Sequence, residues 1–158
     1  MPATTLYLHG QDSSSQGTKG RYFAEHFPHV LSPDFSGTLE ERLHALETIC
    51  RGLKNPLVLI GSSFGGLMAT RFALSHPQRV QHLILLAPAL NFQGFSPPVA
   101  PLDNPALLVI GSNDTVTPPD LVIPAARVTF STLDIRLCND DHLLRQTFPA
   151  MDWQGLLI

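Results

Sequence analysis

The sequence lacks the features that mark a secreted or membrane-bound protein. Only two of its 158 residues are cysteines, Cys50 and Cys138, and neither has metal-ligand spacing or a partner motif. We expect both to be buried thiols in a reduced compartment, with no metal site. No apolar run approaches a membrane span, and the first residues lack the charged start and apolar stretch of a signal peptide. The sequence therefore predicts a cytoplasmic protein without a membrane partner.

Basic clusters are also missing. The chain carries 10 Lys and Arg against 13 Asp and Glu, a formal net charge of -3. Because nucleic-acid binding relies on concentrated positive charge, this balance gives no indication of nucleic acid and favours a small-molecule partner. With 44% hydrophobic residues the chain can build one sizeable core, so we expect a single domain over residues 1–158. Composition leaves its oligomeric state open.

The most informative stretch is Leu-Val-Leu-Ile-Gly-Ser-Ser-Phe-Gly-Gly at residues 57–66. An apolar segment runs into Gly-x-Ser-x-Gly, formed by Gly61, Ser63 and Gly65, and a helix-like run follows. That order is typical of a nucleophile elbow, a strained strand-to-helix turn that fits only small neighbours. A helix beginning there directs free N–H groups and its positive dipole end at a developing negative charge. The stretch predicts a serine prepared for acyl transfer, against the plainer interpretation of a glycine-containing loop.

Segments of strand character alternate with helical ones along the chain. We expect strands at Thr4–Leu8, Val30–Phe35, Leu57–Ile60, His82–Ala87, Ala106–Ile110 and Leu133–Leu137. We expect helices from the late teens to Phe27, from a Thr38 capping box to about Leu53, over Phe64–His76, over Asp120–Arg127 with an interruption at Pro124, and at the end of the segment that runs from His142 to the C-terminus. This alternation predicts an α/β fold with about six mostly parallel strands and helices on both faces, and a ligand beyond the carboxyl ends of the strands.

Two further candidate residues follow predicted strand ends. A serine hydroxyl needs a base to take its proton, and the base needs a carboxylate that fixes its tautomer. Asp114 lies four residues past the strand Ala106–Ile110, and His142 lies five residues past Leu133–Leu137. The order Ser63, Asp114, His142 is the one expected when nucleophile, acid and base follow successive strand ends.

Each assignment has an alternative. Asp114 could instead serve an Asx turn, since Asn-Asp before prolines is turn chemistry, and Asp103 is the next candidate acid. Asp140 and Asp141 adjoin the histidine, but backbone neighbours rarely present side chains to one of its ring nitrogens. His142 could instead begin a helix, capped by one of these two aspartates.

Four segments resemble the α/β-hydrolase superfamily, over essentially the whole chain. They are Leu-Tyr-Leu-His-Gly (6–10), Gly-Ser-Ser-Phe-Gly-Gly (61–66), Gly-Ser-Asn-Asp-Thr-Val-Thr-Pro (111–118) and the late His142. The chain is most similar to small cap-less bacterial serine esterases of the YqiA type, which share the Leu-His-Gly opening followed by serines and a lysine. The resemblance implies a minimal α/β-hydrolase fold with no cap domain and without the first two strands of larger members.

The resemblance also implies roles for individual residues. Ser63 would be the nucleophile, Asp114 the acid and His142 the base of a catalytic triad. The backbone N–H groups of Gln11 and Phe64 would form the oxyanion hole. No metal or organic cofactor is implied.

The predicted loop at residues 88–105 bears on the substrate. Its 18 residues are too few for the helical lid that many lipases insert there, so we expect an open site for short-chain or soluble acyl groups. Leu90, Phe92 and Phe95 are candidate acyl-site residues, unless they form an exposed loop tip. The predicted activity is hydrolysis of carboxylic esters. A thioesterase, an acyltransferase and a non-catalytic binding module remain as alternatives.

Overall fold

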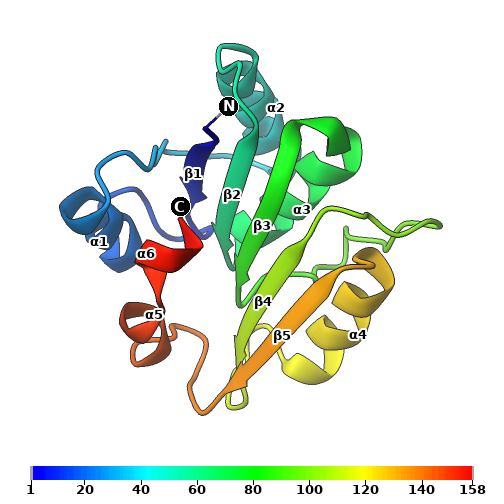
Figure 1. Ribbon diagram of the computed structural model, residues 1–158. Helices are drawn as coiled ribbons and strands as arrows, with labels where there is room; N and C mark the ends of the chain where they lie inside the picture. The colour runs from blue at the N-terminus through cyan, green and yellow to red at the C-terminus, as the bar shows by residue number, and fades with distance from the viewer. Residues whose placement is uncertain (1, 158) are drawn as a thin grey trace.

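The computed structural model describes residues 2–157, and its centre is a parallel β-sheet (Figure 1). The five strands within these residues are β1 (Thr4–Leu8), β2 (Leu57–Ser62), β3 (Val80–Leu86), β4 (Ala106–Gly111) and β5 (Leu133–Cys138). They lie in the order β1-β2-β3-β4-β5, and each neighbouring pair is parallel. The carboxyl ends of all these strands therefore meet at one edge, where open α/β sheets bind their ligands.

The predicted strand Val30–Phe35 does not join this sheet, so the expectation of about six strands exceeds by one the five found in residues 2–157. Only Leu31 pairs with β1, through an isolated bridge. Its N–H donates to the Thr5 carbonyl at 2.9 Å, and its carbonyl accepts from the Tyr7 N–H at 2.8 Å. Pro33 has no N–H with which to continue a ladder, and pairing stops there.

Helices fill most connections between the strands. They are α1 (Thr18–His26), α2 (Leu39–Arg51), α3 (Phe64–Ser75), the short 3₁₀ helix η1 (Pro77–Arg79), α4 (Pro119–Thr129), α5 (Thr147–Ala150) and α6 (Trp153–Leu156). An irregular connection over residues 87–105 joins β3 to β4 instead. Within the described residues, none of the helices has the length and apolar character needed to cross a membrane.

Three local predictions can be compared with these helices. The capping box of α2 is present, since the Glu41 N–H donates to Thr38 Oγ1 at 3.2 Å and the Thr38 N–H donates to Glu41 Oε1 at 3.1 Å. The expected interruption at Pro124 is wrong, because α4 continues through this proline, which lies in its second turn and removes one early hydrogen bond. The segment from His142 onward ends in a helix as expected, since Asp152 caps α6 by accepting from the Gly155 N–H at 3.1 Å, and the equally short α5 precedes it.

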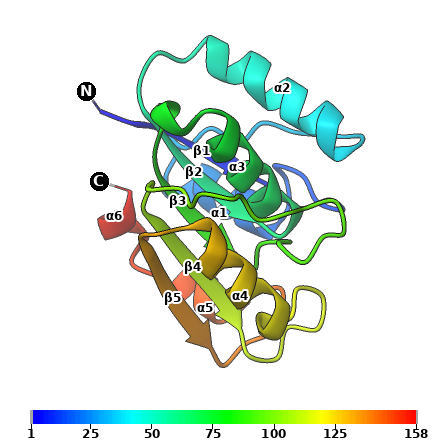
Figure 2. The ribbon, with the colours of Figure 1, turned by 90° about the vertical axis from the view of Figure 1, so that its right-hand side faces the viewer.

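Alternate strand residues enter two cores on opposite faces of the sheet (Figures 1 and 2). One core receives Leu59 and Leu85 and is covered by α2, α3 and α4. The other receives Ile60 and Ile84 and is covered by α1, α5 and α6. The period-two burial of these apolar strands fixes both faces, as in sheets sandwiched between helices.

Candidate active site

Ser63 occupies the sharp turn between β2 and α3 and has φ 54° and ψ −115°, a backbone conformation rare for side-chain-bearing residues. Its N–H donates to the Leu86 carbonyl at 2.9 Å, and its own carbonyl accepts from the Ala89 N–H at 2.9 Å. A Cβ added at Gly65 would overlap the Leu8 carbonyl oxygen of β1. The surrounding chain therefore holds the serine in its strained position.

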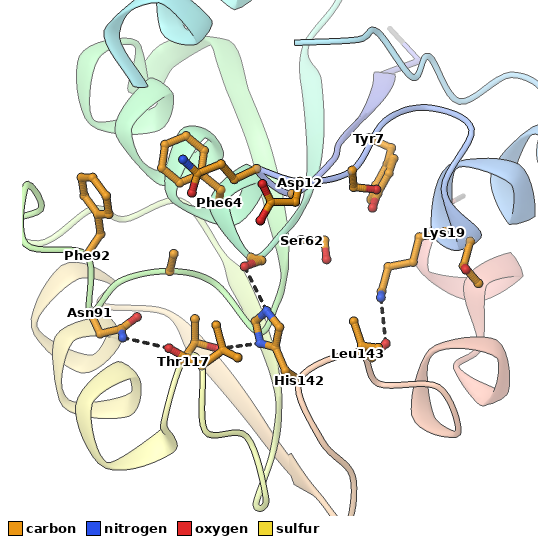
Figure 3. Close-up of a pocket in the computed structure, with 17 residues that line it drawn as sticks. Tyr7, Asp12, Lys19, Ser62, Phe64, Asn91, Phe92, Thr117, His142 and Leu143 are labelled. Carbon is orange, nitrogen blue, oxygen red and sulfur yellow. Dashed lines mark hydrogen bonds between the residues drawn. The ribbon is translucent and has the colours of Figure 1, made fainter. Parts of the chain in front are cut away.

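The three residues predicted from strand ends lie together at the carboxyl edge of the sheet. His142 Nε2 lies 3.1 Å from Ser63 Oγ (Figure 3), and His142 Nδ1 lies 2.8 Å from Asp114 Oδ2. The Asp114 side chain is 0% exposed, whereas that of His142 is 18% exposed. The carboxylate thus fixes one ring nitrogen while the other faces the serine. This arrangement can move a proton from Ser63 Oγ to the imidazole.

Asp114 also forms the Asx turn that the sequence offered as an alternative to a catalytic role. Its Oδ1 accepts from the N–H groups of Val116 (2.9 Å) and Thr117 (2.8 Å), which leaves Oδ2 to face His142. The Asx turn and the contact with the histidine therefore coexist, one on each carboxylate oxygen. The turn holds the carboxylate in the orientation that the imidazole needs.

Thr117 is a functional candidate that sequence reasoning missed. Its buried hydroxyl lies 2.7 Å from Asp114 Oδ2, 3.1 Å from His142 Nδ1 and 3.2 Å from the Ala87 carbonyl. A hydroxyl carries one proton, and the shortest of these contacts is a donation to the carboxylate. A threonine three residues after an aspartate is the sequence signal that could have identified it.

The alternative acids lie elsewhere or are engaged elsewhere. Asp103 is exposed just before β4, at the opposite edge of the sheet, and accepts from Ser131 Oγ at 2.9 Å. Asp140 Oδ2 accepts from the Thr147 N–H and hydroxyl at 2.9 and 2.8 Å. Neither arrangement directs a carboxylate at a ring nitrogen of His142.

The loop after β1 is held from two sides. The ring of the buried His9 accepts from the Phe35 N–H through Nε2 at 2.9 Å, so Nδ1 carries the proton and donates to the Gly10 carbonyl at 2.7 Å. Because a peptide unit is planar, this bond also fixes the direction of the Gln11 N–H. Arg42, which sequence reasoning did not single out, donates to the Gln11 carbonyl at 3.2 Å.

Phe64 is the first residue of α3, directly after Ser63. The first N–H groups of a helix have no intrahelical acceptor, so its amide is free to donate to a ligand. Gln11 and Phe64 both line the cavity that contains Ser63. The structure therefore brings both predicted oxyanion-hole residues to the serine.

Comparisons with known proteins agree with this architecture. The fold superposes on a YdeN-like hydrolase from Pectobacterium atrosepticum with a TM-score of 0.75 and 20% identity, over 99% of this chain and 87% of that one. It superposes on alpha/beta hydrolase domain-containing protein 10 from mouse with a TM-score of 0.75 and 18% identity, over 90% and 82% of the two chains. A family model described as serine aminopeptidase, S33, matches residues 28–102. The chain has the α/β-hydrolase fold.

Sequence relatives of this chain include proteins with different reactions in their names. Lipase LipV of Mycobacterium tuberculosis is 30% identical over 106 residues, which are 59% of this chain and 40% of the lipase. A 1-acylglycerol-3-phosphate O-acyltransferase of Arabidopsis thaliana is 54% identical over 39 residues, 25% of this chain and 8% of the relative. The chain thus spans less than half the length of these curated relatives.

A cavity of about 550 Å³ surrounds Ser63. Figure 3 shows Phe64 and Phe92 on one side of His142, and Tyr7, Ser62 and Lys19 on the other. The rings of the two phenylalanines meet edge to face, with centroids 5.6 Å apart. The cavity therefore has an apolar side and a polar side. Of the three residues expected in an acyl site, only Phe92 lines it, since Leu90 and Phe95 are buried in the core.

Two titratable side chains form the polar side. Burial raises the pKa of the Tyr7 phenol, and a hydrogen bond with Ser62 acts in the opposite direction. Burial lowers the pKa of Lys19, while Asp140 and Asp141 favour its charged form. Lys19 Nζ donates to the Leu143 carbonyl at 2.8 Å and thereby links α1 to the loop that carries His142.

Among residues 2–157 no three His, Cys, Asp or Glu side chains gather as a metal site would require. The expectation of two buried thiols is wrong in part. Cys50 is buried between α2 and the sheet, whereas Cys138, at the end of the edge strand β5, is only half-buried.

Proposed function

We propose that this protein is a serine hydrolase that cleaves carboxylic esters with short-chain or soluble acyl groups. The observation that carries the proposal is the continuous hydrogen-bonded chain from Ser63 Oγ through His142 to Asp114. A serine hydroxyl is a weak nucleophile until a base removes its proton, and this chain supplies an oriented base.

In the first half-reaction Ser63 Oγ attacks the acyl carbonyl while its proton passes to His142 Nε2. The carbonyl oxygen becomes an oxyanion, and the N–H groups of Gln11 and Phe64 donate to it. The C–O bond to the alcohol then breaks, and the imidazolium returns the proton to the departing oxygen. Asp114 stabilises the imidazolium throughout without taking its proton.

In the second half-reaction water attacks the acyl-enzyme. His142 accepts a proton from the water, and the new oxyanion occupies the same pair of N–H groups. Collapse of this intermediate releases the carboxylic acid, and the proton returns to Ser63 Oγ. Atoms balance as one ester and one water giving one acid and one alcohol.

The shape of the cavity supports small substrates. Its volume of about 550 Å³ lies within the range of pockets for small molecules. The connection from β3 to β4 carries no helix in the described chain, and so supplies no helical lid over the serine. Phe64 and Phe92 provide an apolar surface of a size suited to a short acyl chain.

A fluorophosphonate probe tests the proposal without knowledge of the substrate. The expected result is one adduct on the peptide that carries Ser63, absent from Ser63→Ala and strongly reduced in His142→Ala. The same protein should hydrolyse 4-nitrophenyl butyrate. Folded protein that forms no adduct and hydrolyses no ester would overturn the proposal and favour a non-catalytic binding module.

Acyl transfer is the second candidate, because the sequence relatives include acyltransferases such as the homoserine O-succinyltransferase of Saccharophagus degradans, 32% identical over 75 residues. Thioester cleavage would use the same residues. Reaction of 4-nitrophenyl butyrate in the presence of added alcohols distinguishes a hydrolase from an acyltransferase. An acyltransferase would convert most of the acyl-enzyme to the new ester, whereas a hydrolase would release mainly the acid. Parallel assays with butyryl thioesters test whether a thiol is a better leaving group than an alcohol for this protein.

A further inference from the structure

Lys19 places a cation on the polar side of the active-site cavity. It comes from α1, and Figure 3 shows it across the cavity from Phe64 and Phe92, on the side of Tyr7 and Ser62. Neither the proposed proton transfers nor the oxyanion contacts use this ammonium. Its position in a cavity built for a small molecule therefore calls for a substrate-binding explanation.

The Lys19 ammonium has more N–H donors than its hydrogen bonds within residues 2–157 use. An ammonium carries three N–H donors, and one is occupied by the Leu143 carbonyl at 2.8 Å. Within residues 2–157 no carboxylate oxygen lies within 4.0 Å of Nζ. The ring of Phe148 lies on another side, with its centroid 5.5 Å from Nζ. A half-buried cation with unused donors is stabilised when a ligand supplies a negative charge.

The neighbouring carboxylates of Asp140 and Asp141 accept hydrogen bonds from the backbone of their own loop. Asp140 Oδ2 accepts from the Thr147 and Gln146 N–H groups, at 2.9 and 3.2 Å. Asp141 Oδ1 accepts from the Leu143 N–H at 3.1 Å. These carboxylates favour the charged form of Lys19 without accepting from it, and Lys19 lines the cavity.

A second hollow of about 470 Å³ shares Thr18, Lys19 and Leu143 with the first. Arg21 and Arg145 line this second hollow together with a single acid, Glu25. Among the residues that line the second hollow, cations therefore outnumber anions. Asp12 also lines the main cavity and offsets one positive charge, which favours a singly charged ligand over a dianion.

We infer that Lys19 is a specificity-determining residue that binds a carboxylate carried by the ester substrate. This inference rests on the proposed function, since it assigns the substrate class of the same site. The preferred substrate is thus an ester with a small apolar part on the Phe64 and Phe92 side and a carboxylate on the Lys19 side. The carboxylate belongs either to the acyl group or to the leaving alcohol, and the experiment separates the two.

The test compares two pairs of esters by kcat/KM. In the first pair the carboxylate is on the acyl group, in mono-4-nitrophenyl glutarate against 4-nitrophenyl pentanoate. In the second it is on the leaving group, in 3-acetoxybenzoate against phenyl acetate. The quantity measured is the ratio of charged to neutral ester, which removes any general effect of a substitution on His142.

Lys19→Met should lower this ratio at least about tenfold for one of the two pairs, as expected when a charged hydrogen bond is lost. Lys19→Arg should keep most of the ratio, because it retains the charge. Lys54→Met is the matched control, since Lys54 is an exposed lysine just before β2, at the opposite edge of the sheet. A ratio that Lys19→Met leaves unchanged for both pairs, or that Lys54→Met lowers equally, overturns the inference.

Failure of the proposed function can be told apart from failure of this inference. It would appear as an absence of Ser63 labelling and of hydrolysis of either neutral ester. In that case calorimetric binding of monomethyl glutarate, which carries one negative charge, to Ser63→Ala, with and without Lys19→Met, still tests the carboxylate site. Equal binding by both proteins, or binding by neither, would overturn it.

Discussion

The hydroxyl of Thr117 lies 2.7 Å from Asp114 Oδ2, the same oxygen that faces His142. The carboxylate is fully buried, so each hydrogen bond it accepts offsets part of the cost of removing its charge from water. We therefore expect Thr117→Val, which keeps the shape and removes the donor, to lower the rate of fluorophosphonate labelling about tenfold and stability by about 1–3 kcal/mol.

Thr117→Ser separates a hydroxyl effect from a packing effect. It keeps the donor and removes a methyl group, so its labelling rate should stay within about threefold of the original protein. Labelling kinetics and denaturant unfolding should be measured on both variants. If serine loses as much labelling as valine, the hydroxyl has no positioning role.

Ser63 offers a test of stored backbone strain. Its φ of 54° and ψ of −115° suit glycine better than any residue with a Cβ. Ser63→Gly should therefore be more stable to denaturant than Ser63→Ala, by about 1 kcal/mol, although neither can be labelled. Equal stabilities for the two variants would show that the turn holds no strain of this kind.

The positions of Ser63, Asp114 and His142 could be predicted because a parallel sheet brings all its strand ends to one edge. Each residue follows an apolar strand by a few positions, so the order of strands alone places them near one another. The same logic ranked Asp103, which precedes its strand, behind Asp114 as the candidate acid.

Other parts of the site could not be predicted from local patterns. The bond between Lys19 and Leu143 joins residues 124 positions apart, and the bond from Arg42 to Gln11 spans 31 positions. Nothing in the sequence near Lys19 or Arg42 signals these contacts. The segment Val30–Phe35 has strand-like composition, but one bridge at Leu31 is all the pairing that forms before Pro33.

Gly65 and Gly52 form a matched pair for substitution by alanine. A Cβ at Gly65 would overlap the Leu8 carbonyl and lie 2.7 Å from the His9 carbonyl oxygen, both in rigid backbone. Gly65→Ala should therefore cost about 3 kcal/mol or more and slow labelling of Ser63, because β1 and the Gln11 loop must move. At Gly52 the nearest atom would be 3.5 Å away and the backbone is helical, so Gly52→Ala should be neutral or stabilising by about 0.5 kcal/mol.

Denaturant unfolding and the labelling rate together test this pair. The two alanine variants add the same methyl group, so a general effect of alanine would appear in both. A Gly65→Ala protein as stable as Gly52→Ala would contradict the close approach of α3 to β1.

The two thiols should differ in reactivity. Burial raises the pKa of Cys50 to about 11, and a thiol alkylates only as the thiolate, so Cys50 stays protonated and inert near pH 8. Cys138 is half-buried and accessible to reagent. Native protein should therefore gain one iodoacetamide adduct, on Cys138, and the second only on unfolding. Mass spectrometry with Cys138→Ser as control checks this, and a native adduct on Cys50 would contradict it.

The pH dependence of ester selectivity should follow the charge of Lys19. Burial lowers the pKa of this ammonium, and Arg145 acts in the same direction, while Asp140 and Asp141 oppose them. A lysine is charged below its pKa, so preference for a carboxylate-bearing ester should be greatest at pH values below the lowered pKa. It should decline as the pH rises through the lowered pKa, before an exposed lysine would titrate.

The ratio of kcat/KM for the charged and neutral esters, followed from neutral pH to about pH 10, measures this decline. In Lys19→Arg the ratio should stay flat over the same range, because arginine keeps its proton there. A parallel decline in both proteins would assign the effect to another group.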